Sequence, residues 1–265
     1  MPARELVVPK ETVRRLLREA TELDLLLVGG QALKLWVERY RVVLPDEFAY
    51  VSRDVDFLAP SAAASDVVRK LARALGGRAV FPRRRAALTA LVGQAVKDVS
   101  DDEVFNVDVV HRVYGADEGL RARAMELRLG ADLGARLMHP LDVLKSRLDN
   151  LHGLAEKRNE LGKAQLRAAI AVAQAFQREA LRAENAPGAR RPTTLRYAAF
   201  VERLAASAAG KKVAARYGIH VADAIEPSAV PVREFCEKKL PVLGRLMSSS
   251  RRRELGLSEP PPTVR

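Results

Sequence analysis

Two aspartates, Asp54 and Asp56, are separated by one residue in a short apolar stretch of the chain. Alternate residues of a strand project from one face, about 7 Å apart along the chain. The spacing therefore predicts both carboxylates on one face, with Val55 and Phe57 facing the core. Two like charges held there repel each other unless a cation lies between them. Mg²⁺ or Mn²⁺ prefers such oxygen ligands and shares its shell with substrate phosphates, so the pair predicts a metal site.

A third carboxylate, Asp108, lies in the alternating stretch 103–110, where Val107 and Val109 are expected to face the opposite way. From an adjacent strand it would complete a set of three metal ligands. Three carboxylates can hold two ions, one activating an attacking hydroxyl and one stabilising a leaving pyrophosphate. Asp108 is also a candidate base for the hydroxyl proton. The alternative, a strand end or a buried hydrogen-bonding group, stays open.

Two glycines, Gly29 and Gly30, follow the apolar run 25–28 and precede a helical pattern. Without side chains the backbone can approach a phosphate closely, and free amides at a helix N-terminus can bind it. Gln31 is a candidate side-chain donor, and Ser52 is a second candidate contact for the same triphosphate. A double glycine in this position is also typical of an ordinary turn.

Alternating helix and strand patterns would position these residues. Helical stripes of apolar residues cover 11–23 and 31–40, and Ser65 is expected to cap a helix that Gly76-Gly77 ends. The expected strands are 25–28, 54–58, 78–81, 87–96 and 103–110. Beyond Pro140 only helical patterns follow, at 141–151, 162–184 and 193–209. We expect an α+β fold, with a small mixed-sheet domain at 1–138 and a helical domain at 139–265.

The order of these motifs resembles the DNA polymerase β-type nucleotidyltransferase superfamily, and most closely its branch of AbiEii-like toxins. The likeness lies in Val28-Gly29-Gly30-Gln31-Ala32-Leu33 and in Ser52-Arg53-Asp54-Val55-Asp56-Phe57-Leu58, and less specifically in the segment around Asp108. The resemblance implies a nucleotidyltransferase domain, with Mg²⁺ or Mn²⁺ as cofactor and an NTP as substrate. It also implies a toxin that is neutralised by an antitoxin protein.

The segment from His139 to Arg147 resembles the stretch that opens the C-terminal domain in that branch. A lysine there faces the active site, so the resemblance makes Lys145 a candidate contact for the triphosphate. A cation on the exposed surface of a helix is the alternative.

The formal net charge of +12 favours a polyanionic partner, and RNA, above all tRNA, is the leading acceptor. A basic hairpin at Arg83-Arg84-Arg85 is one candidate contact, and a solvated basic surface is the alternative. A protein or small-molecule acceptor, or a non-catalytic binding scaffold, also remains open. No stretch approaches the roughly 20 apolar residues of a membrane helix, and no signal-peptide core is seen. With Cys236 as the only cysteine, we expect a cytoplasmic protein.

Overall fold

The computed structural model describes residues 4–43, 54–82, 90–184, 194–230 and 232–258. Contacts divide the chain into two compact units. Unit 1 comprises Met1–Glu38 and Leu44–Ser146, and unit 2 comprises Arg39–Val43 and Arg147–Arg265. The expected α+β class with a mixed sheet is confirmed. Within the described residues, no helix is both long and apolar enough to cross a bilayer.

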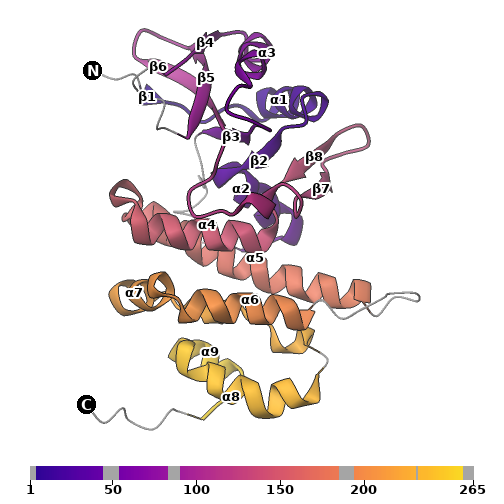
Figure 1. The fold of residues 1–265 in the computed structure, drawn as a ribbon, viewed down its shortest axis with the longest axis vertical. Coiled ribbons are helices and arrows are strands. Elements are labelled where there is room, and N and C mark those ends of the chain that lie inside the picture. The colour runs from indigo at the N-terminus through magenta and orange to yellow at the C-terminus, as the bar shows by residue number, and fades with distance from the viewer. Residues whose placement is uncertain (1–3, 44–53, 83–89, 185–193, 231, 259–265) are drawn as a thin grey trace. The chain divides into compact units, whose positions relative to one another are not determined.

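Unit 1 is built on a mixed sheet in which the described strands run in the order β4-β5-β6-β3-β2-β8-β7 (Figure 1). Their bounds are β2 Leu26–Val28, β3 Val55–Leu58, β4 Arg78–Val80, β5 Leu91–Asp98, β6 Glu103–Val110, β7 Met125–Arg128 and β8 Gly134–Leu137. A further strand, β1 Arg4–Glu5, pairs with the start of β6. Strands β1 and β3 both run parallel to β6, and β5 runs antiparallel to it.

Three helices that begin in unit 1 lie where the sequence predicted helices. They are α1 Lys10–Glu22, α2 Gly29–Tyr40 and α3 Ser65–Leu75. Helices α1 and α3 pack against each other and against the sheet. The only tryptophan, Trp36, lies buried in α2, and its indole Nε1 donates to the Met138 carbonyl at 2.8 Å. The Gly76 C-cap has a left-handed backbone, as predicted. The prediction that Ser65 caps the start of this helix is wrong. Ala64 is the N-cap residue, and no side chain caps this helix.

Unit 2 is helical in its described residues, beginning with the second half of α4 Pro140–Gly153. The remaining α-helices are α5 Glu160–Glu184, α6 Thr194–Ala206, α7 Ala208–Tyr217, α8 Leu240–Leu243 and α9 Ser249–Glu254. The predicted stripe of α5 is buried from Leu166 to Phe176. A single helix was expected to continue to residue 209, but Ser207 interrupts it. Its hydroxyl accepts from the Gly210 amide at 3.1 Å and starts a new helix.

Candidate active site

Asp56 and Asp108 are direct neighbours on adjacent parallel strands, because β3 and β6 pair them in register. Neighbouring strands lie about 4.8 Å apart, and residues in register project from the same face. Val55 and Val107, one position earlier in each strand, are fully buried. The apolar side chains therefore face the core, and the two carboxylates share the opposite face of the sheet.

Two amide side chains hold the carboxylate of Asp108. Gln94 is its register partner on β5, and Gln94 Nε2 donates to Asp108 Oδ1 at 2.9 Å. Asn106, two residues earlier on β6 and buried, donates through Nδ2 to the same oxygen at 2.9 Å. These bonds fix the orientation of Asp108, since a carboxylate held by two donors cannot rotate without losing one of them.

Gly29 brings the start of α2 directly against Asp56. It follows Val28, the register partner of Asp56 on β2, and has a left-handed backbone with φ of +69°. A Cβ added to Gly29 would overlap Asp56 Oδ2 and lie 2.9 Å from Asp56 Cγ. The glycine turn and the aspartate motif, 27 residues apart in the sequence, thus form one site. Gly30 and Gln31 are buried beside it, with Gln31 only 2% exposed.

Two further carboxylates complete the cluster. Asp54 immediately precedes β3, and Glu5 lies on β1, beside β6. Burial, a hydrogen bond to Asp54, and the negative charges of Asp54 and Asp108 raise the pKa of Glu5 to about 7. Asn106 Nδ2 also donates to Glu5 Oε1 at 3.1 Å, which acts in the opposite direction. Three acidic groups, Glu5, Asp54 and Asp108, therefore influence one another in this part of unit 1.

Sequence reasoning did not assign Glu5, Gln94 or Asn106 to the site. Glu5 joins it through a two-residue strand whose partners lie almost a hundred positions away, so no local pattern marks it. Gln94 is recognisable only from the β5–β6 register. Asn106 carried a usable signal, because it alternates with Asp108 on the same predicted strand face.

The chemistry of this donor set fits a hard divalent cation, because every candidate ligand is a carboxylate oxygen. Among the described residues, no three His, Cys, Asp or Glu side chains are already arranged as a metal site. Such an arrangement is not required of a magnesium site. Mg²⁺ commonly uses one or two carboxylates, with water and substrate phosphate oxygens completing its shell.

No protein-family model matches the chain, and no curated protein sequence matches it significantly. The site is therefore defined by its own geometry. Two aspartates are paired in register on adjacent strands, a glycine packs against one of them, and two amide side chains hold the other.

The remaining sequence candidates are placed differently. Lys145, on α4, donates a hydrogen bond to the Gly115 carbonyl. Its ammonium also lies near Asp117, whose pKa is lowered chiefly by a hydrogen bond from Arg123 and less by Lys145. A contact between Lys145 and a nucleotide stays a prediction. Ser52 and Arg83-Arg84-Arg85 lie outside the described residues.

Proposed function

We propose that unit 1 is a metal-dependent nucleotidyltransferase domain that moves an NMP group from an NTP to an acceptor hydroxyl and releases pyrophosphate. The observation that carries this proposal is the register pairing of Asp56 with Asp108, with Gly29 packed against Asp56. Asp54, Asp56 and Asp108 would hold Mg²⁺ or Mn²⁺. When bound, the metal neutralises the charge that develops on the phosphate oxygens.

The residues of the chain have separate roles in this reaction. Asp108, which Gln94 and Asn106 hold through hydrogen bonds, would accept the proton of the acceptor hydroxyl. Gly29 leaves room for the Asp56 carboxylate at the start of α2, and the free amides of this helix N-terminus would bind the triphosphate. Phosphoryl transfer of this type depends mainly on positioning and charge neutralisation, so few chemical groups are needed.

RNA is the proposed acceptor, with tRNA the first to be tested. The support is electrostatic: unit 1 contains 21 Lys and Arg and 21 Asp and Glu, whereas unit 2 contains 24 and 12. The whole formal charge of +12 therefore belongs to the helical unit. A toxin role with an antitoxin partner is supported by the sequence resemblance alone. Induction of this gene in a bacterial host should then slow growth, and unaffected growth would count against the role.

The transfer reaction can be tested with radiolabelled NTPs, Mg²⁺ and three acceptor pools: total RNA, protein and small alcohols. We expect label in RNA from the unaltered protein. Asp56→Asn should lower labelling by at least about 100-fold, because one ligand to the charge-neutralising ion is lost. Asp101→Asn is the matched control, since Asp101 is exposed in the turn between β5 and β6.

Three results would change the proposal. Full Mg²⁺-dependent labelling by Asp56→Asn would show that the metal assignment is wrong. Label in protein or in small alcohols, with none in RNA, would support NMP transfer but show that RNA is not the acceptor. Calorimetry that detects neither Mg²⁺ nor NTP binding would favour a non-catalytic scaffold instead.

A further inference from the structure

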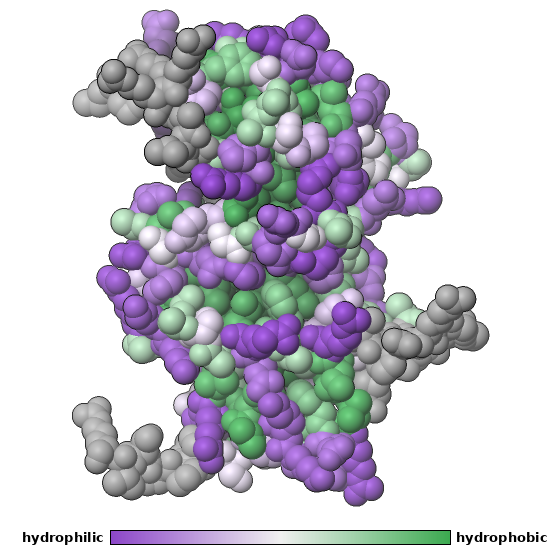
Figure 2. Space-filling view, viewed as in Figure 1, coloured by the Kyte–Doolittle hydropathy of each residue, from purple (hydrophilic) through white to green (hydrophobic). Residues whose placement is uncertain are grey.

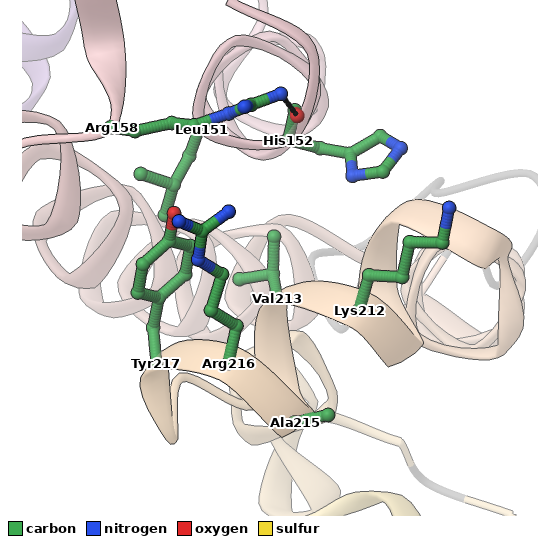
Figure 3. A pocket seen from close by; sticks show the side chains of 8 residues that line it. All are labelled: Leu151, His152, Arg158, Lys212, Val213, Ala215, Arg216 and Tyr217. Atoms are coloured by element: carbon green, nitrogen blue, oxygen red, sulfur yellow. Dashed lines mark hydrogen bonds between the residues drawn. The ribbon is translucent and has the colours of Figure 1, made fainter. Parts of the chain in front are cut away.

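A basic pocket of about 360 Å³ lies within unit 2, between the end of α4 and helix α7 (Figure 3). Its floor is apolar, because Leu151 and Val213 are buried. Among the described residues, its lining contains the side chains of Arg158, Lys212, Arg216 and His152 and no carboxylate. Figure 3 shows the Lys212 and Arg216 side chains extending from α7 toward the segment that carries His152 and Arg158. A concave site with several cations and no acid is suited to an anion.

Local contacts hold two of these cations in place. Arg158 Nη2 donates to the His152 carbonyl at 2.7 Å, which leaves its other N–H groups available. The Arg216 guanidinium lies over the Tyr217 ring, 5.2 Å from its centroid, and Lys163 Nζ lies 5.4 Å from the same ring. Cations ordered before binding lose less side-chain entropy when a ligand arrives.

The charges of Lys212 and Arg216 are also available to a ligand. Both are exposed, and among the residues that the structure describes neither has a carboxylate within ion-pair distance. Lys163, by contrast, is paired with Glu160 at 2.6 Å. An anion at this pocket would therefore not have to displace an existing ion pair of Lys212 or Arg216.

We infer that this pocket binds the phosphate backbone of a nucleic-acid strand. The cations come from separate segments that surround an open pocket, an arrangement suited to successive phosphates of a chain. They belong to the unit that carries the entire net charge of +12, and Figure 2 shows hydrophilic side chains over much of its visible face. The inference goes beyond the proposed function, because binding here needs neither the metal nor a transfer reaction.

The test is filter binding of radiolabelled oligouridine of about 20 nucleotides, a strand without stable structure of its own. The pocket variant is Lys212→Glu/Arg216→Glu. The matched control is Arg196→Glu/Arg245→Glu, which makes the same charge change at two exposed positions of unit 2 outside the pocket lining. Circular dichroism checks folding, and Lys212→Gln/Arg216→Gln provides a milder pocket variant.

The expected result is a loss of affinity of at least about tenfold in the pocket variant and a much smaller loss in the control. The slope of log affinity against log salt, between about 50 and 200 mM, should fall by about two in the pocket variant only. Equal losses in the two variants would overturn the inference. So would displacement of the RNA by inorganic phosphate at matched ionic strength, which would indicate a site for a free anion.

The two proposals can fail separately. Oligouridine binding is measured without Mg²⁺ and NTP, so it does not depend on the transfer reaction proposed for unit 1. RNA binding that is weakened chiefly by the pocket substitutions, without NMP transfer, would uphold the pocket and count against the enzyme. NMP transfer, with pocket substitutions that do not affect RNA binding, would support the enzyme and count against the pocket.

Discussion

Gly29 is the residue on which the geometry of the candidate site depends most directly. Its left-handed backbone and its contact with Asp56 exclude any side chain at this position. The left-handed backbone is a conformational constraint, and the contact with Asp56 is a steric one. Another glycine of unit 1 has the left-handed backbone but no such close contact. Gly76 has φ of +72°, and an added Cβ there would meet only Lys97 Nζ, at 3.9 Å.

Gly29→Ala should therefore destabilise the protein more than Gly76→Ala. The left-handed backbone costs alanine roughly 1–2 kcal/mol at either position. The overlap with Asp56 should add about 1–3 kcal/mol at position 29 only. Urea denaturation of the two variants measures the difference. Adding Asp56→Ala to Gly29→Ala should recover most of the extra loss, and equal destabilisation at positions 29 and 76 would contradict the contact.

The sequence predicts part of the candidate site, and the reason is that this part is local. Asp56 and Asp108 stand in strands whose alternation is visible in neighbouring residues, and Asp54 immediately precedes the first of these strands. Val55, Phe57, Val107 and Val109 are buried as that alternation requires. The contribution of Glu5 depends on pairing between distant segments, which no local pattern encodes.

At the scale of elements, the start of α4 combines a cap with a titratable group. His139 immediately precedes the helix, and its Nδ1 accepts a hydrogen bond from the Leu141 amide at 3.1 Å. That bond requires an unprotonated Nδ1. Burial lowers the pKa of His139 to about 4, with the Arg123 charge acting in the same direction and Asp142 opposing it.

Acidification should therefore weaken the fold through His139. Its folded-state pKa lies below the unfolded value of about 6.5, so the unfolded chain takes up the proton first. The stabilisation is complete above pH 6.5 and is lost as the pH falls toward 4, by on the order of 3 kcal/mol. His139→Asn keeps a capping oxygen and does not titrate. Denaturation at several pH values should show a flatter curve for the variant, and parallel curves would contradict this role.

Element prediction succeeds where the apolar pattern is clear and fails where few apolar residues carry it. The bounds of α3 and β6 agree with the sequence prediction, because each has a complete period of apolar residues and clear ends. Strand β5 begins at Leu91 and ends at Asp98, later than expected at both ends. The β7–β8 hairpin was missed, because each of its strands contains only two apolar residues. The break between α6 and α7 was also missed. It depends on one hydroxyl, that of Ser207, within a stretch whose composition favours a continuous helix.

At the scale of the whole molecule, charge is distributed very unequally between the units. Unit 2 carries an excess of 12 positive charges, whereas unit 1 is formally neutral. Like charges concentrated in one unit repel one another, and dissolved salt screens that repulsion.

Added salt should therefore stabilise the protein. Between about 20 and 500 mM NaCl we expect the free energy of urea unfolding to rise by on the order of 1 kcal/mol. Arg196→Glu/Arg245→Glu removes four units of positive charge from unit 2 and should flatten that dependence. If stability fell with salt, attractive ion pairs would outweigh repulsion in this protein.

The indole of Trp36 gives the two units different optical properties. It is the chain's single tryptophan, buried in the part of α2 that belongs to unit 1, a few residues after the glycine turn. Intrinsic tryptophan fluorescence therefore arises from unit 1 alone, without any label. Exposure of the ring to water would shift the emission to longer wavelength. Changes around the proposed nucleotide-binding turn can thus be followed by tryptophan fluorescence in the intact protein. The helical unit contains no tryptophan and does not contribute to this emission.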